Sequence, residues 1–136
     1  MKPGKLSKVK FPIEYRLLIT PRYNERQKKT LTFIEMQTVT EFTNFLYEII
    51  VEDSVTDHDL RLKIHGLRAP KMSFPGTGPA TFKKEFSNLD GTYHVIVTKL
   101  ERGENIFVVD ISSQKVILQK SPTNKFIEIV TSFEEW

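Results

Sequence analysis

Cysteine is absent from this sequence of 136 residues. The chain therefore has no disulfide bond and no thiolate that could act as a nucleophile or a metal ligand. Long apolar runs are missing as well, because no stretch approaches the roughly 18 uninterrupted apolar residues that a membrane-spanning helix needs. These absences leave a hydrophobic core as the main source of stability.

Residues that carry chemistry are few and scattered. The three histidines are His58, His65 and His94, and they lack the H-x-H or H-x-x-x-H spacing typical of a zinc site. His58 lies between Asp57 and Asp59, a triplet that suits a solvated hairpin loop. The FPGTGP string lacks the Lys and Ser/Thr of a phosphate-binding loop, and no nucleophile stands beside an identifiable base. We therefore expect no enzyme activity, no metal and no cofactor.

The residues that are present describe one ordinary globular domain. Hydrophobic residues make up 39% of the chain and charged residues 27%, and ten phenylalanines with four tyrosines supply bulk for a core. The N-terminal stretch begins with basic residues, but Glu14 and Arg16 interrupt any signal-peptide core and no small-residue cleavage site follows. We expect a cytoplasmic location.

Positive charge is concentrated at the start of the chain. Residues 1–30 carry nine Lys or Arg against two Glu, and the remaining 106 residues carry eleven basic and fifteen acidic groups. Such a segment either binds a polyanion such as nucleic acid or pairs with the acidic body of its own domain. The candidate basic surface consists of Arg16, Arg22, Arg26, Lys28 and Lys29.

Apolar alternation predicts a β-rich domain. Residues 1–9 have no apolar periodicity and predict a flexible basic tail, and residues 10–136 form the single domain. Strands are predicted at 11–20, 31–37, 43–52, 60–67, 81–86, 91–100, 105–111 and 115–120. Segment 38–53 also has helical features, because Thr38 and Glu41 resemble a capping box. Its Thr, Val, Ile, Phe and Tyr residues favour a strand at 43–52, paired with 60–67 as a hairpin.

The C-terminal segment predicts a helix over residues 122–136. Ser121 and Pro122 fit an N-cap followed by proline at the first helical position. Four apolar residues then follow at helical spacing, namely Phe126, Ile129, Val130 and Phe133. A final strand at 125–131 would also satisfy the composition.

The stretch LDGTYHVIV, which contains Leu89 and Tyr93, resembles the start of strand F in immunoglobulin-like and fibronectin-like sandwiches. In that family the tyrosine hydroxyl returns to the backbone just upstream and pins a corner between two strands. The resemblance implies that Tyr93 is the corner tyrosine and Leu89 the core residue before it. Val95 replaces the antibody cysteine and no early core tryptophan exists, so the likeness is to the broad architecture. We expect an immunoglobulin-like antiparallel β-sandwich of seven or eight strands with a C-terminal helix, and the alternatives are a β-barrel or an α+β fold.

Alternation on the last hairpin leaves an outward apolar patch. If Tyr93 and Phe107 point into the core, then Ile96, Ile106 and Val108 point outward. Such a patch needs a cover, which is either the C-terminal helix or a partner.

These observations favour a non-catalytic protein-interaction or structural module, with another protein or a second copy as its partner. The first alternative is a β-barrel that carries a small apolar ligand. The second is polyanion or nucleic-acid binding through the basic N-terminal segment.

Overall fold

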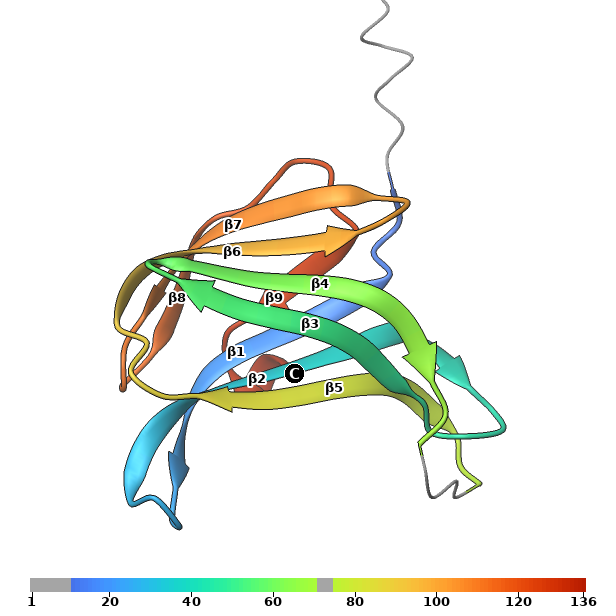
Figure 1. Cartoon of the computed structure of the whole chain (residues 1–136), viewed down its shortest axis with the longest axis horizontal. Coiled ribbons are helices and arrows are strands. Elements are labelled where there is room, and N and C mark those ends of the chain that lie inside the picture. The colour runs from blue at the N-terminus through green and yellow to red at the C-terminus, as the bar shows by residue number, and fades with distance from the viewer. Residues whose placement is uncertain (1–10, 71–74) are drawn as a thin grey trace, which may run out of the picture.

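The computed structural model describes residues 11–70 and 75–136, and within them the regular elements are strands apart from one short 3-10 turn (Figure 1). The predicted tail at 1–9 lies outside the described residues. The strands are β1 (Tyr15–Asn24), β2 (Lys29–Phe42), β3 (Glu48–Thr56), β4 (Asp59–Arg68), β5 (Gly78–Phe86), β6 (Gly91–Lys99), β7 (Gly103–Ile111), β8 (Val116–Lys120) and β9 (Ile127–Val130). The turn η1 (Phe133–Glu135) follows β9.

All nine strands belong to one sheet, which curls into a nearly closed barrel (Figure 1). Their order is β8-β7-β6-β4-β3-β5-β2-β1-β9. Antiparallel ladders join β1 to β2, β3 to β4, β6 to β7 and β7 to β8. The pairing predicted for the hairpin of 43–52 and 60–67 is confirmed as β3 and β4, but β3 begins five residues later than predicted, at Glu48.

The expected sandwich is not confirmed. A sandwich consists of two separate sheets, whereas here hydrogen-bonded pairing continues through all nine strands in one sheet. A parallel pairing from Asp59↔His94 to Ile64↔Lys99 joins β4 to β6 and links the two halves of the chain. The barrel named as the alternative agrees with this arrangement. Asn105 on β7 draws the two ends of the sheet together, since its side-chain oxygen accepts the Phe126 N–H at 2.8 Å just before β9.

The core fills the inside of this sheet with apolar side chains from all nine strands. Leu17, Leu62, Val95 and Phe107 have no exposed surface. They belong to one continuous cluster that extends from β1 to β9. The interior is therefore packed with side chains, as in other small barrels.

The predicted helix at 122–136 is wrong. Residues Ile127–Val130 form β9 instead, which pairs in parallel with β1 from Tyr15↔Ile127 to Leu18↔Val130. Ile127 and Ile129 enter the core, whereas Val130 packs on the outer side of the wall. Both faces of this strand are covered, so its apolar residues do not alternate with polar ones. Their spacing therefore resembles that of a helix.

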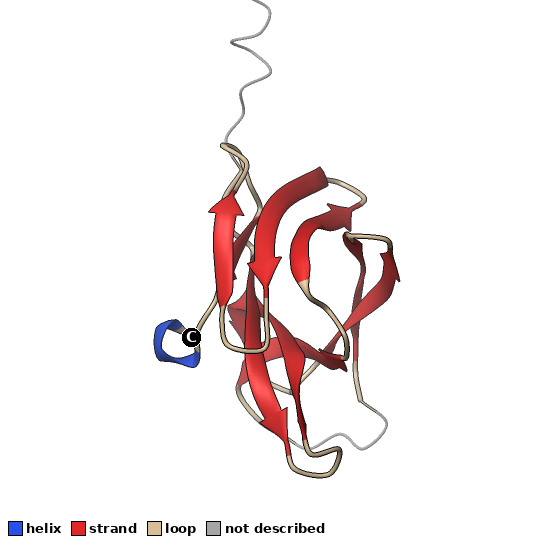
Figure 2. Cartoon of the chain, turned by 90° about the vertical axis from the view of Figure 1, so that its left-hand side faces the viewer, coloured by secondary structure: helices blue, strands red, loops and turns tan. Residues whose placement is uncertain are grey.

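The chain beyond β9 covers the outer face of β1 and β2 (Figure 2). Leu18, Phe33 and Val130 form a second apolar cluster there, with Trp136 packed against it. The Phe133 ring stacks on Phe33 at a centroid distance of 5.9 Å. This segment therefore covers β1 and β2, and not the β6–β7 patch that the sequence suggested it would cover.

Tyr93 makes the contact that the resemblance implied for it. Its hydroxyl accepts a hydrogen bond from the Asp90 N–H at 3.3 Å, and its side chain is buried. Leu89 packs against the core beside it. A tyrosine corner thus stands at the entry to β6 within a barrel-like sheet.

Candidate binding site at the open end of the barrel

One end of the barrel, here called the open end, collects the ends of β2, β4 and β6 and the starts of β1, β3, β5 and β7. The tight turns between β1 and β2, between β3 and β4 and between β7 and β8 lie at the opposite end. The registers of the strand pairs fix which strand ends lie at which end of the barrel. At the open end they bring together segments that are far apart in the sequence.

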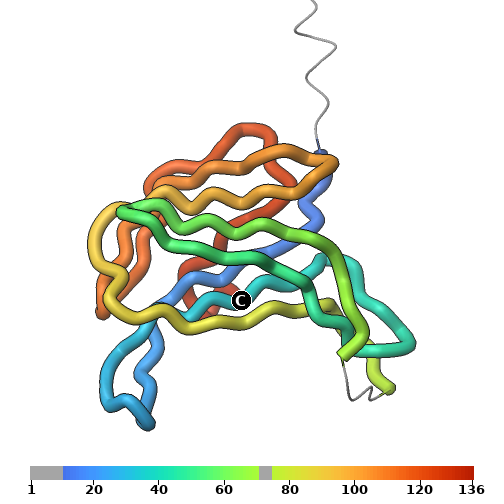
Figure 3. Tube along the Cα trace, in the orientation of Figure 1, coloured from blue at the N-terminus to red at the C-terminus, as the bar shows by residue number. Residues whose placement is uncertain are grey.

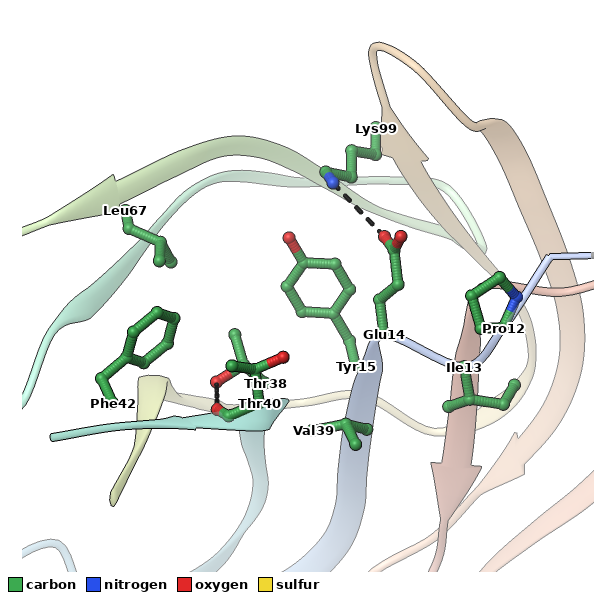
Figure 4. Close-up of a pocket in the computed structure, with 10 residues that line it drawn as sticks. All are labelled: Pro12, Ile13, Glu14, Tyr15, Thr38, Val39, Thr40, Phe42, Leu67 and Lys99. Atoms are coloured by element: carbon green, nitrogen blue, oxygen red, sulfur yellow. Dashed lines mark hydrogen bonds and ion pairs between the residues drawn. The ribbon is translucent and has the colours of Figure 1, made fainter. Parts of the chain in front are cut away.

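A pocket of about 430 Å³ lies at the open end (Figure 4). It is lined by residues that precede β1, end β2, end β4 and end β6. Its walls include Ile13, Val39, Phe42 and Leu67, and half of the lining residues are apolar.

A three-residue ion cluster borders this pocket. Glu14 accepts from Lys99 Nζ at 3.3 Å and from Arg102 Nη2 at 2.8 Å. Glu14 and Lys99 are 85 positions apart in the sequence. The Arg102 guanidinium also lies 4.9 Å from the centre of the Phe11 ring, and Glu101 Oε1 lies 3.8 Å from Lys99 Nζ, so two carboxylates balance the two cations.

Both central members of the cluster have shifted pKa values. Partial burial alone would raise the pKa of Glu14, but the hydrogen bonds and charges of Arg102 and Lys99 outweigh it and leave that pKa below its ordinary value. Burial alone would likewise lower the pKa of Lys99, but Tyr15, Glu14 and Glu101 together raise it. Both groups are therefore held in their charged forms.

Tyr15 contributes a hydroxyl that makes no hydrogen bond with another described residue. Tyr15 is 6% exposed, and its hydroxyl is directed toward the space between Leu67 and Lys99 (Figure 4). Lys99 Nζ lies 5.5 Å from the centre of the ring. No hydrogen bond to this hydroxyl occurs within the described part of the chain. A ligand group that accepts a hydrogen bond would satisfy the Tyr15 hydroxyl beside the Lys99 ammonium.

An apolar rim lies at the open end, and two of its members, Val39 and Leu67, line the pocket. It consists of five large apolar side chains that are exposed at the open end: Val39, Phe45, Leu46, Leu67 and Leu100. Phe45 and Tyr47 in the β2–β3 connection meet edge to face at 6.1 Å. Exposed apolar residues gathered on one surface are typical of a binding site, whereas scattered ones are not.

The patch expected at Ile96, Ile106 and Val108 lies on the outer side of the wall, where Ile96 pairs directly with Ile106. Ile96 is 7% exposed and Ile106 47% exposed, and Val108 is half-buried. The patch is therefore smaller than the sequence suggested, with Ile106 as its accessible centre.

The five residues of the candidate basic surface are divided between two environments. Arg16 donates to the Glu135 carbonyl at 3.0 Å and lies over the Trp136 ring, and Arg22 pairs with Glu85 at 3.1 Å. Arg26, Lys28 and Lys29 lie exposed at the β1–β2 turn. Two of the five charges are thus used to hold the domain together.

The histidines do not meet in one site. His65 contacts Glu52 at 3.0 Å, and His94 contacts Asp59 at 3.3 Å. His58 packs on Tyr93 at 4.8 Å between ring centres. Across residues 11–70 and 75–136, no three His, Asp or Glu side chains converge in a way that could hold a metal ion.

Sequence reasoning missed Glu14, Tyr15 and Lys99 as site residues. Glu14 is a lone acidic residue before a β-rich segment, which is a weak sign that it has a buried partner. Its cations lie on β6 and the β6–β7 turn, and only the barrel topology brings them near. The described residues contain no helix long and apolar enough to span a membrane.

Comparisons with known proteins add no family and no functional precedent. No protein-family model matches the chain, and no similar curated protein or solved structure was found.

Proposed function

We propose that this protein is a non-catalytic interaction module that binds a partner protein through the open end of its barrel. The observation that carries the proposal is the exposure of Val39, Phe45, Leu46, Leu67 and Leu100 at the open end, where Val39 and Leu67 also line the pocket. Burying such side chains releases about 25 cal/mol per Å² of apolar surface. A rim of this kind around a few polar groups has the anatomy of a protein interface.

The polar groups of the pocket support binding more than catalysis. Glu14 is neutralised by two cations, so it is a poor general base. Tyr15 and Lys99 offer a donor and a positive charge, which suits a carboxylate or carbonyl on the partner. We infer that the partner presents an apolar side chain next to an acidic group.

A small amphipathic ligand is the second candidate for the same pocket. It is favoured by the unpaired Tyr15 hydroxyl and by a pocket volume of about 430 Å³, within the range of small-molecule sites. The barrel interior itself is filled by side chains, so such a ligand would bind at the mouth of the barrel and not inside it.

The test compares three single variants in affinity purification from cell extract followed by mass spectrometry. Leu67→Asp alters the apolar rim, Ile106→Asp alters the outer patch, and Ile117→Asp is the control, because Leu67 and Ile117 are 41% and 40% exposed. We expect Leu67→Asp alone to lose the proteins that co-purify with the wild type. Loss with Ile106→Asp alone would instead assign binding to the outer patch, and equal capture by all three variants would refute both surfaces.

A further inference from the structure

The barrel wall has one weak line, between β3 and β5. These two strands run parallel, and their ladder contains the single pair Glu48↔Thr81. Beyond that pair the two ribbons diverge (Figure 3). Every other neighbouring pair of strands in the sheet shares at least four paired positions among the described residues. We call the line between β3 residues 49–56 and β5 residues 82–86 the seam.

Both sides of the seam carry unpaired backbone groups. The Thr81 N–H donates to the Tyr47 carbonyl across the seam, and the Ala80 N–H turns the other way, toward Thr38 of β2. Because backbone groups of successive strand residues point to opposite edges, Lys83 and Glu85 also face the seam. Within the described chain, no backbone bond of β5 crosses the seam beyond Thr81.

The same alternation identifies the groups on β3. The Tyr47 carbonyl faces β5, so the N–H and C=O groups of Val51, Asp53 and Val55 face the seam as well. The extra residue of the β3–β4 ladder lies on β4, where the register skips His65, so it does not disturb this alternation. The seam thus presents about five residues of open edge, roughly 16 Å at 3.3 Å per residue.

Side-chain exposure shows that the wall is open here. Val51, Phe82 and Phe86 point inward and pack against the core, yet they remain partly exposed. Ile64 and Met36, which pair with Val51 and Phe82 on the neighbouring strands, are only 3% and 0% exposed. A groove of about 370 Å³ lies at the paired end of the seam.

Charge also marks the seam. Lys84 Nζ bonds Asp53 Oδ2 at 2.6 Å across it. Lys83 is exposed on the outer side and has no ion-pair partner in the described residues. A strand placed in the seam would bring an outward side chain beside Lys83, where an acidic residue would be favoured.

We propose that the seam between β3 and β5 binds an extended segment of a partner protein as an added strand. Its inward side chains are apolar where they meet Val51, Phe82 and Phe86 and polar where they meet the Lys84–Asp53 ion pair between them, and one outward side chain is Asp or Glu, next to Lys83. A segment antiparallel to both β3 and β5 forms two antiparallel ladders, the more stable kind. This surface is separate from the apolar rim, so the proposal goes beyond the function proposed above.

The experiment selects binders from a phage library of random eight-residue peptides against the whole protein. Lys83→Pro removes one N–H from the seam edge and leaves the bonds to β2 in place, since edge positions tolerate proline. Lys83→Ala is its matched control, because it keeps the N–H and removes only the charge. We expect enriched peptides with alternating apolar residues that bind Lys83→Pro at least about tenfold more weakly, while Lys83→Ala loses only the preference for Asp or Glu.

Two further measurements keep the proposal falsifiable. A synthetic copy of an enriched peptide, N-methylated at alternate amides, keeps its side chains but cannot form both ladders, and it should bind the wild type at least about tenfold more weakly. This comparison uses only the wild-type protein, so it can be made even if Lys83→Pro fails to fold. The proposal is overturned if no alternating peptide is enriched, or if the peptides bind equally with and without N-methylation. Peptides that lose affinity for Leu67→Asp, with no effect of Lys83→Pro, would assign binding to the apolar rim instead.

Discussion

At Tyr93 the ring and the hydroxyl contribute separately to the fold. The ring is buried with the core and packs against His58, whereas the hydroxyl accepts the Asp90 N–H. Tyr93→Phe keeps the ring and leaves that N–H without its acceptor, which costs about 1–2 kcal/mol. Urea unfolding should show this loss, while Tyr23→Phe, at a tyrosine that is 57% exposed, changes stability by less than about 0.5 kcal/mol. Equal stability of the two variants would mean that the hydroxyl contributes nothing.

Glu14 links stability to pH at the open end. Its pKa is lowered in the folded state from the ordinary 4.5, so ionised Glu14 stabilises the fold above that value. The contribution is lost as the pH falls through the lowered folded pKa. Glu14→Gln should cost about 2 kcal/mol at pH 7, since it leaves Lys99 and Arg102 without their carboxylate.

The measurement is urea unfolding from pH 7 to about pH 2. The difference between wild type and Glu14→Gln should shrink below pH 4.5 and close in strong acid. Hydrogen bonds from Thr92 and Gln119 also lower the pKa of Asp110, but that residue titrates alike in both proteins and cancels from the difference. Glu128→Gln, at an exposed glutamate on β9, is the control and should give a flat difference. A pH-independent gap for Glu14→Gln would exclude the linkage.

Among the elements, the segment after β9 depends on aromatic contacts with β2. Phe33 is buried beneath Phe133, and the Arg22 guanidinium lies 3.8 Å from the centre of the Phe33 ring. The two rings should therefore show a coupling of about 0.5–1.5 kcal/mol in a double-mutant cycle of Phe33→Ala and Phe133→Ala. Leu100→Ala in place of Phe133→Ala is the control cycle, because Leu100 is 94% exposed. Additive losses in the first cycle would show that the segment does not stabilise the barrel.

Alternation allowed most strands to be predicted, because one face of each is buried. On β6 and β7 it also identified the inward residues Tyr93 and Phe107, both of which are buried. It failed at β9, where the apolar residues serve two clusters on opposite sides of the wall. The spacing of such residues then does not distinguish a helix from a strand. The segment forms a strand because it pairs with the otherwise free edge of β1.

At the scale of the whole molecule, the pairing between strands distant in sequence decides whether the fold is a barrel or a sandwich. The parallel pairs β4–β6 and β1–β9 have no turn signal between them, so sequence patterns cannot reveal them. The pocket depends on the same pairings, since they bring Lys99 beside Glu14. Most strands and the β3–β4 hairpin were predictable, but the parallel neighbours, and therefore the site, were not.

The nearly unpaired seam raises the question of whether the barrel unfolds as one unit. The seam divides β8, β7, β6, β4 and β3 from β5, β2, β1 and β9, yet one continuous core cluster contains residues from both groups. We therefore expect a single cooperative transition. Trp136, the one tryptophan, reports on the β1–β2 side, so its fluorescence and the far-UV circular dichroism should change at the same urea concentration. A fluorescence midpoint at lower urea would show that the β1–β2 side opens first, and that the shared core does not hold the two groups of strands together.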